Sequence, residues 1–207
     1  MASSTFAQPL PPTLADRMAT GYTFENGVYV GHDLAWVRNV PAGALSTTAG
    51  DVAHFMIAHL QEGRYGEARI LAPETVRTMH ARHFAHSPEA GGWTYGFMEI
   101  EVNGERVLWH GGTMRFHHTG LALLPERGIG LFVSYNAPAG TDARTEFVDA
   151  LIDHYFPTPL NAGADPAVDV DPARFAGEYL PTRANQTTPE KLYLLLNRLH
   201  VRPYGES

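Results

Sequence analysis

The sequence predicts an α+β fold in which an antiparallel sheet is flanked by helices. Between residues 93 and 136, β-prone runs alternate with turn residues, which is typical of an antiparallel meander. Apolar residues at helical spacing occur before and after this region, so helices can cover the sheet. Apolar residues make up 44% of the 207-residue chain, which is enough for a buried core.

The chain before the sheet is expected to start with irregular structure and a hairpin. Three prolines between residues 9 and 12 argue against a regular helix there. The dipeptide Asn26-Gly27 lies between two β-prone runs within residues 21–30. Because Asn-Gly favours the tight turn that joins antiparallel strands, we expect a hairpin at this point.

Two helices are expected next. Thr48, with Asp51 three residues later, resembles a capping box and begins the first of them. Gly63 favours an end to this helix. Pro73, a favoured first-turn residue, begins the second. The residues expected on the buried faces are Val52, Phe55, Met56 and Leu60 in the first helix and Val76 and Met79 in the second.

The sheet is predicted to contain four strands and to be followed by a helix. The first strand covers residues 93–102, and its apolar phase slips after Gly96, which indicates a bulge. Asn103-Gly104 predicts a hairpin turn into residues 107–110, and the last two strands cover about residues 116–124 and 129–136. The helix that follows is expected to bury one face, made of Phe147, Val148, Leu151, Ile152 and Tyr155.

The chain is expected to divide at a linker. Residues 157–173 are rich in proline and aspartate and have no helical or strand periodicity. We therefore predict one domain over residues 1–156, a linker over 157–173 and the truncated start of a β-rich domain over 174–207. This last segment is too short to bury a core of its own.

Composition excludes several classes of function. Without cysteine, the chain has no disulfides, no thiolate metal site and no cysteine nucleophile. A net charge of −7 disfavours binding to nucleic acid. The first residues lack the basic and apolar regions of a signal peptide, and no apolar run is long enough to span a bilayer.

No serine in the sequence has the surroundings of an activated nucleophile. Neither a Gly-x-Ser-x-Gly nor a Ser-x-x-Lys motif occurs. Lys191 is the only lysine, and the residue three positions before it is Thr188. Because Pro189 lies between them, we interpret this segment as a helix start rather than a catalytic pair.

Histidines and carboxylates supply further candidates. His80, His83 and His86 are spaced by three, and a histidine metal hydrolase would need such a cluster, but a solvated helix end explains them as well. His117 and His118 alternate across a strand, so they are not expected to face one site. Glu99 and Glu101 share a strand face, which we interpret as a solvated sheet edge rather than a glycosidase pair. No metal is expected.

The segment of residues 108–113 carries the clearest chemical signal. His110, Gly111, Gly112 and Thr113 follow an apolar strand. Glycines would let a substrate backbone lie close to an exposed strand edge, a free N–H beyond them can face an oxyanion, and a protonated histidine can hold a carboxylate. A tight turn with an incidental histidine is the alternative, and these residues alone leave both open.

Several segments, taken in order, resemble the C-terminal part of the serine β-lactamase and penicillin-binding protein family, of the class C and esterase-like type. They are residues 43–51, 70–76, 95–96, 110–112 and 125–130, with Asn136. The resemblance covers about residues 1–155 and implies a β-lactamase/transpeptidase-like fold that is incomplete. Residues 175–179 are similar to the start of a small β-rich domain often appended to such hydrolases.

The resemblance implies a role for each residue of the strand-end segment. His110, Gly111 and Gly112 match the family's third motif, a Lys-Thr-Gly or His-x-Gly element on a sheet-edge strand. His110 and Thr113 would then be catalytic, with the Thr113 N–H as an oxyanion donor, and Gly111 and Gly112 would bind substrate. The first motif, Ser-x-x-Lys, is missing. Residues 134–136 fit the second motif, Ser-x-Asn, but follow the third, so we interpret this match as coincidence.

The resemblance also implies a truncated serine hydrolase. Residues 1–6 and 21–22 are similar to the segment that follows the first two motifs, so we expect Met1 to be an internal methionine of a longer, exported protein. An upstream serine would attack D-alanyl peptides of peptidoglycan type, β-lactams or esters, without a cofactor, and the 207-residue chain alone should be inactive. The alternative is a non-catalytic pseudo-enzyme or peptide-binding module that uses the same sheet-edge groove.

Overall fold

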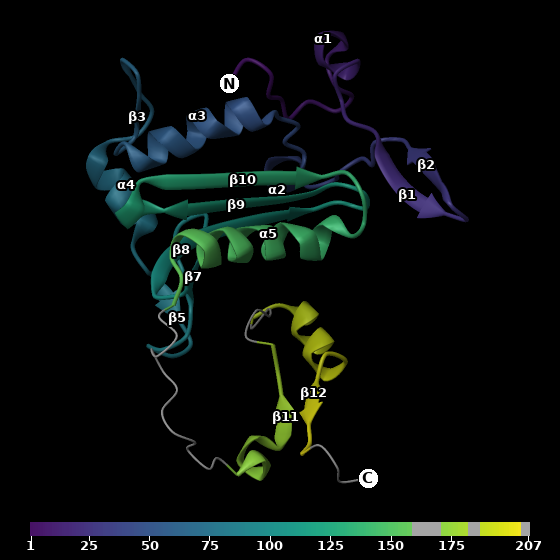
Figure 1. Ribbon diagram of the computed structural model, residues 1–207. Helices are drawn as coiled ribbons and strands as arrows, with labels where there is room; N and C mark the ends of the chain where they lie inside the picture. The colour runs from purple at the N-terminus through teal and green to yellow at the C-terminus, as the bar shows by residue number, and fades with distance from the viewer. Residues whose placement is uncertain (159–170, 182–186, 204–207) are drawn as a thin grey trace. The chain divides into compact units, whose positions relative to one another are not determined.

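The computed structural model describes residues 1–158, 171–181 and 187–203, and the chain divides into two units, Met1–Thr158 and Pro159–Ser207 (Figure 1). The first unit contains a six-stranded antiparallel sheet in the order β10-β9-β8-β7-β6-β5. Its strands are β5 (Phe84–Ala85), β6 (Gly92–Trp93), β7 (Met98–Val102), β8 (Glu105–Thr113), β9 (His118–Leu124) and β10 (Ile129–Tyr135). The predicted α+β class, with an antiparallel sheet flanked by helices, is confirmed.

Two helices cover opposite faces of the sheet (Figure 1). Helix α3 (Ala49–Leu60) packs Val52 and Met56 on one face, against a core that includes Leu108 and Leu123. Helix α5 (Gly140–Tyr155) packs Val148 and Ile152 on the other face, against a core made by Val107, Ala122 and Leu124. Neighbouring residues of β8 thus point to different helices, as the alternation of side chains along a strand requires.

The start of α3 follows the capping prediction only in part. Thr48 accepts a hydrogen bond from the Asp51 N–H, at 3.2 Å. The Asp51 carboxylate accepts instead from the N-terminal segment, from the Ser3 N–H and the Ser4 hydroxyl at 2.7 Å each. The helix ends at Leu60, and Gly63 follows with a φ of +86°.

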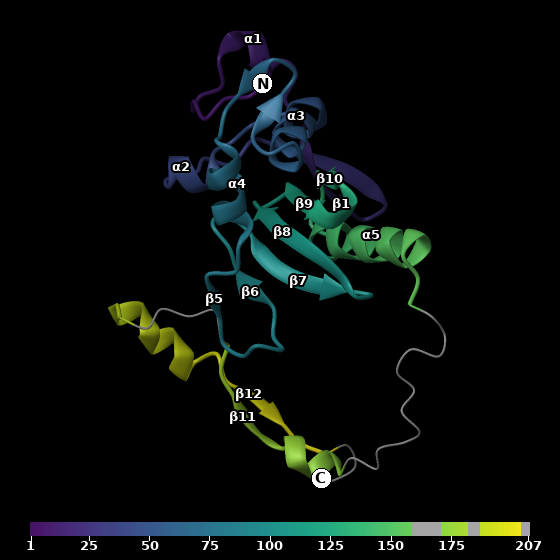
Figure 2. The ribbon, with the colours of Figure 1, turned by 90° about the vertical axis from the view of Figure 1, so that its left-hand side faces the viewer.

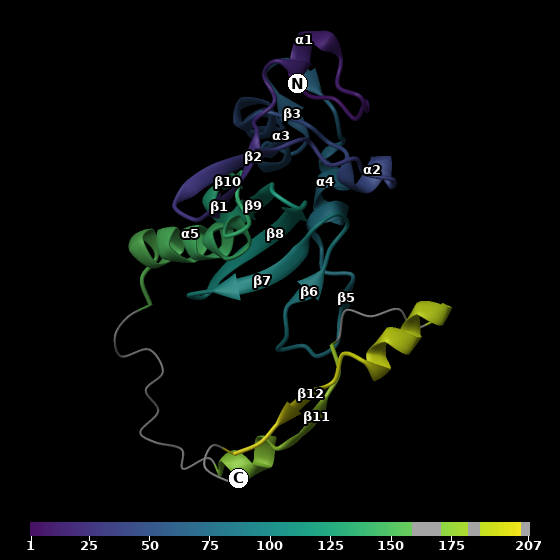
Figure 3. The ribbon, with the colours of Figure 1, turned by 90° about the vertical axis from the view of Figure 1, so that its right-hand side faces the viewer.

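Both predicted Asn-Gly turns are present. Asn26-Gly27 joins β1 (Gly21–Glu25) to β2 (Val28–His32), and Asn103-Gly104 joins β7 to β8. All four residues have positive φ, the conformation that this turn requires. The β1–β2 hairpin lies beside the end of β10, where the Tyr22 N–H donates to the Asn136 carbonyl at 2.8 Å (Figure 3).

The predicted strand over residues 93–102 was wrong, because the structure has a hairpin there. Residues 94–97 form a turn between β6 and β7, with Trp93 opposite Met98 (Figure 2). The Thr94 N–H donates to the Phe97 carbonyl at 3.0 Å. Gly96 has a φ of +89°, so the slip in apolar phase marks a reversal of the chain rather than a bulge.

Three smaller expectations also differ from the structure. A short helix, α1 (Pro12–Ala15), forms in the proline-rich segment, because Pro12 occupies its first turn, where no N–H is needed. Phe147 and Tyr155 are exposed and lie outside the buried face of α5.

The remaining elements of this unit are α2 (Val40–Gly43), β3 (Arg64–Tyr65), β4 (Ala68–Arg69), α4 (Pro73–His80) and the 3₁₀ helix η1 (Pro125–Arg127). Helix α4 begins at Pro73 as predicted, and it buries Val76.

The second unit contains a small two-stranded sheet of β11 (Gly177–Tyr179) and β12 (Leu199–Val201). Two 3₁₀ helices, η2 (Pro172–Phe175) and η3 (Pro189–Leu195), accompany it, and Lys191 lies in η3. Most of the predicted linker falls outside the described residues. None of the helices that the structure describes is long and apolar enough to cross a membrane.

Candidate functional site at the end of strand β8

The last residues of β8 have a strand partner on one edge only. Strand β9 pairs with β8 as far as Thr113, which lies opposite His118. Strand β7 pairs with β8 only as far as Trp109, which lies opposite Met98. In the part of the chain that the structure describes, residues 110–113 therefore have one open edge in the sheet.

The backbone alternation decides which amides face this open edge. The Met114 N–H donates to the His117 carbonyl at 2.8 Å, so the amide of Met114 points toward β9. Successive residues of a strand direct their N–H and C=O groups to opposite edges. The N–H and C=O groups of Gly111 and Thr113 therefore face the open edge, while those of Gly112 face β9.

The side chains of the two predicted catalytic residues leave the strand on different faces. His110 lies opposite Leu121, on the face covered by α3, and it is exposed. Thr113 lies opposite His118, on the face covered by α5, and it is also exposed. The two residues share the strand end, but only the backbone of Thr113 faces its open edge.

The two glycines leave room for side chains of the protein itself. A Cβ at Gly112 would lie 2.5 Å from Thr119 Oγ1, and a Cβ at Gly111 would lie 3.2 Å from Arg144 Nη1. Thr119 of β9 and Arg144 of α5 thus contact the two glycines on the faces of the sheet, and the open edge is a separate surface. A side chain at either glycine would therefore displace one of these two internal contacts.

Arg144 is a site residue that the sequence interpretation missed. Its Nη1 donates to the Gly112 carbonyl and, at 3.0 Å, to the Thr119 carbonyl. A signal for it exists in the sequence, because Arg144 precedes the buried residues Val148 and Ile152 by four and eight positions. This spacing places it on the same helix stripe, which faces the sheet.

His118 is buried beneath the same strand end. Its side chain is 4% exposed, and its Nδ1 lies 2.9 Å from the Thr141 hydroxyl. Burial lowers the pKa of His118, and the nearby charge of Arg144 lowers it further. The side chain of His117 lies on the other face of the sheet. There its Nε2 forms a hydrogen bond of 3.0 Å with the Ala19 carbonyl. The predicted alternation of these two histidines is confirmed.

A cavity of about 300 Å³ lies on the α3 face next to this strand end. Met114, Thr119 and Ser134 contribute to its wall, together with residues of the segments before α3. Ser134 therefore borders open space. Asn136 instead donates to the Thr20 carbonyl at 2.8 Å and so holds the β1–β2 hairpin.

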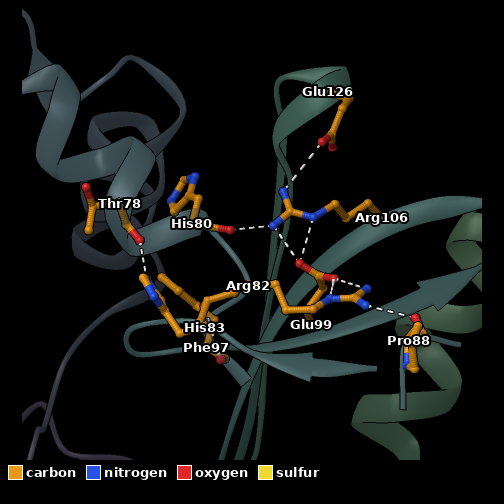
Figure 4. A network of polar contacts seen from close by, with 10 residues as sticks. Thr78, His80, Arg82, His83, Pro88, Phe97, Glu99, Arg106 and Glu126 are labelled. Atoms are coloured by element: carbon orange, nitrogen blue, oxygen red, sulfur yellow. Dashed lines mark hydrogen bonds and ion pairs between the residues drawn. The ribbon is translucent and has the colours of Figure 1, made fainter. Parts of the chain in front are cut away.

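The interpretation of Glu99 as part of a solvated sheet edge was wrong. Glu99 is 5% exposed and accepts hydrogen bonds from Arg82 Nε at 2.6 Å and from Arg106 Nη2 at 2.7 Å (Figure 4). Burial by itself would raise the pKa of Glu99, but the bonds from the two arginines outweigh it, and the pKa is lowered. Glu101, two residues along, is exposed. The pair therefore lacks the shared environment that two catalytic carboxylates need.

The spaced histidines do not converge on one site. His80 Nε2 lies 3.1 Å from His59 Nδ1, and burial, with the neighbouring His80, lowers the pKa of His59 to about 4. His83 lies beyond the end of α4 and stacks on Tyr95, with 3.9 Å between ring centroids. Among the residues that the structure describes, no group of three or more histidines and carboxylates is arranged to hold a metal ion.

Solved structures resemble the chain in fold, and a family model matches its sequence. No curated protein matches it. A solved structure of an octameric penicillin-binding protein homologue from Pyrococcus abyssi is 18% identical, with a TM-score of 0.58 over 73% of this chain and 34% of its own. A structure of SurE is 20% identical, with a TM-score of 0.56 over 80% of this chain and 39% of its own.

A structure of a D-stereospecific amidohydrolase from Streptomyces sp. is 20% identical over 72% of this chain and 43% of its own, with a TM-score of 0.49. The chain thus spans less than half the length of each of these structures. The likeness to the penicillin-binding protein homologue and to SurE shows a shared fold, the β-lactamase/transpeptidase-like arrangement of sheet and helices. A family model described as Beta-lactamase matches residues 1–153, and the chain therefore belongs to the Beta-lactamase family, which relates it to serine hydrolases.

Proposed function

We propose that the end of β8 forms one wall of a serine-hydrolase active site, and that the nucleophilic serine belongs to a part of the protein outside these 207 residues. The observation that carries this proposal is the Thr113 N–H at the open edge of β8, next to two glycines. A free backbone N–H in such a place can hold the oxyanion that forms when a serine attacks a carbonyl.

The open edge also favours an extended acyl substrate. Gly111 and Thr113 both direct an N–H and a C=O group to this edge. A peptide can add to such an edge as a further strand, with main-chain hydrogen bonds that set its register. D-alanyl peptides fit this geometry. β-Lactams and simple esters are smaller molecules that also contain an acyl carbonyl open to attack. The exposed imidazole of His110 would polarise the site or bind a substrate carboxylate.

The proposal predicts that the 207-residue chain is inactive, because its sequence contains no Ser-x-x-Lys motif. Purified chain incubated with a fluorescent penicillin should show no covalent label. The coding sequence upstream of Met1 should contain an in-frame Ser-x-x-Lys, and a protein that includes it should take up the label. Serine-dependent labelling of the 207-residue chain would overturn the assignment of the nucleophile.

Two substitutions in the longer protein test the oxyanion donor. Thr113→Pro removes the N–H at an edge position, where no strand bond is lost, and should lower the acylation rate by about 10²–10³-fold. Thr113→Ala keeps the N–H and should stay within about threefold of the wild-type rate. If both variants acylate at the wild-type rate, the Thr113 amide is not the donor.

A non-catalytic peptide-binding module is the second candidate, because the edge amides are present in a sequence that lacks the nucleophile motif. This function predicts that the 207-residue chain binds D-alanyl-D-alanine without turnover, and that no Ser-x-x-Lys lies upstream in frame. Chemical-shift changes confined to the amides of residues 110–113 during a titration with the dipeptide would support it.

A further inference from the structure

Arg144 bonds the same peptide group that carries the proposed oxyanion donor. Its Nη1 donates to the Gly112 carbonyl, and the N–H of that peptide group is the N–H of Thr113. The bond reaches the peptide from the α5 face of the sheet, so the guanidinium leaves the open edge free. The guanidinium lies directly beside the position that a Cβ of Gly111 would occupy. From that position, Nη1 is 3.2 Å and Cζ is 3.3 Å away.

Arg144 is not paired with a carboxylate in the part of the chain that the structure describes. Among the described residues, its guanidinium forms no ion pair, and its Nε is buried without a hydrogen-bond partner. The carbonyls of Gly112 and Thr119 are the acceptors that the structure shows for it. An arginine that is not paired with a carboxylate retains a strong local field, which acts on the peptide it bonds.

We propose that Arg144 is a positioning residue that polarises the Gly112–Thr113 peptide and makes the Thr113 N–H a stronger donor. A cation that bonds a peptide oxygen draws electron density from the peptide nitrogen, and the N–H at its other end becomes more acidic. Such a preorganised charge stabilises a developing oxyanion without contacting it. The inference rests on the proposed function for its consequence in catalysis, but the polarisation itself is a property of this chain.

Hydrogen exchange of the Thr113 amide separates polarisation from simple support of the strand. Base-catalysed exchange removes the amide proton, so a more acidic N–H exchanges faster. Loss of the cation in Arg144→Met should therefore slow the exchange of Thr113, by about tenfold for a shift of about one pKa unit. A residue that only ties α5 to the sheet would not slow this exchange, because the Thr113 N–H has no strand hydrogen bond to lose or gain.

The experiment uses the full ¹⁵N-labelled chain and three variants. Arg144→Met is the test, and Arg144→Lys, which keeps the charge, should restore most of the exchange rate. Arg115→Met is the matched control, because it removes one positive charge two residues from Thr113, from an exposed arginine that lies over the Phe116 ring. Its Thr113 exchange should change less than about twofold, since a solvated charge is screened by water.

A fourth variant keeps the proposal testable if Arg144→Met does not fold. Gly111→Ala introduces a Cβ at 3.2 Å from Arg144 Nη1, so the guanidinium must move by a few tenths of an ångström and its bond to the Gly112 carbonyl is weakened. This variant should also slow the exchange of Thr113. An unchanged or faster exchange in folded Arg144→Met overturns the proposal, and so does a faster exchange in Gly111→Ala.

The exchange measurement needs no nucleophile, so it can fail or succeed independently of the proposed function. Slower exchange in Arg144→Met would support the polarisation of the peptide. If the longer protein is then not acylated, the proposed function is wrong while the polarisation is still supported. In an active longer protein, Arg144→Met should lower kcat and leave KM nearly unchanged, because the oxyanion forms only once the serine attacks and is absent from the bound substrate. A change confined to KM would contradict the inference.

Discussion

Replacement of Glu99 by glutamine tests the charge network at the centre of the sheet. Glu99 lies on β7, buried beside Leu108 of β8, and accepts hydrogen bonds from Arg82 and Arg106 (Figure 4). Arg106 supplies both its Nε at 2.9 Å and its Nη2 at 2.7 Å. Glu99→Gln keeps the size of the side chain but removes its charge, so Arg82 loses its anionic partner and Arg106 retains only the contact with Glu126 at 3.5 Å.

The structure sets the size of the expected loss. Removal of one partner from a fully buried ion pair costs about 3–5 kcal/mol. The side chains of Arg82 and Arg106 are 40% and 33% exposed, so water replaces part of the lost interaction. We therefore expect the free energy of unfolding to fall by about 2–3 kcal/mol. In a unit of this size, each kcal/mol lowers Tm by about 2–4 °C, which gives a decrease of about 4–12 °C.

Differential scanning calorimetry at pH 7 measures this decrease, and Glu101→Gln is the matched control. Glu101 is exposed on the same strand, so its substitution should change the stability by less than about 0.5 kcal/mol. Because the pKa of Glu99 is lowered in the folded state, its contribution is present above the unfolded value of 4.5 and is lost as pH falls below it. The difference in Tm between wild type and Glu99→Gln should therefore shrink as the pH falls below 4.5 and Glu99 becomes protonated. Equal Tm values for Glu99→Gln and Glu101→Gln at pH 7 would refute the role of the network.

Substitutions at three further positions have defined outcomes. The pKa of His59 is lowered to about 4, below its value of 6.5 in the unfolded chain, so stability should fall by up to about 3 kcal/mol as pH drops from 6.5 toward 4. His59→Gln should reduce this dependence of the free energy of unfolding on pH, measured by urea unfolding at a series of pH values. An equal pH dependence in the variant and the wild type would contradict the assignment to His59. Gly120→Ala places a Cβ 2.5 Å from the Trp109 ring and should destabilise the protein by about 1–3 kcal/mol, measured as a lower urea midpoint; an unchanged midpoint would show that the ring moves freely. Thr48→Ala removes the helix cap of α3 and should cost about 1 kcal/mol, whereas Thr48→Ser should restore it; chemical denaturation of the two variants side by side measures the difference.

Local sequence was sufficient where the structure depends on local backbone conformation. Asn26-Gly27 and Asn103-Gly104 were predicted as hairpin turns, and their positive φ values are a requirement of the turn itself. The helix over residues 49–60 was predicted from Thr48 and an apolar stripe, both contained within a few turns of chain.

Local sequence was insufficient where a glycine permits more than one conformation. Gly96 marked a break in the predicted strand over residues 93–102, but a bulge and a hairpin both accept its positive φ. The structure has the hairpin because β6 pairs with both β5 and β7, which are contacts between segments. Contacts between segments also explain why the burial of Glu99 was not predicted. Its partners Arg106 on β8 and Arg82 before β5 are 7 and 17 residues away in sequence.

By itself, the sequence determined the class of the fold, the family resemblance and the short run of residues from His110 to Thr113. It also determined the lack of a Ser-x-x-Lys motif, since a motif is a property of the chain alone. Only the tertiary structure decided which edge of β8 is open, which amides face it and that Arg144 bonds the carbonyl behind Thr113. Arg144 and Gly112 are 32 residues apart, and α5 brings them together by packing Val148 and Ile152 on the sheet. The physical reason is that burial of an apolar helix face is encoded locally, whereas the polar contact that this burial creates depends on where the two surfaces meet.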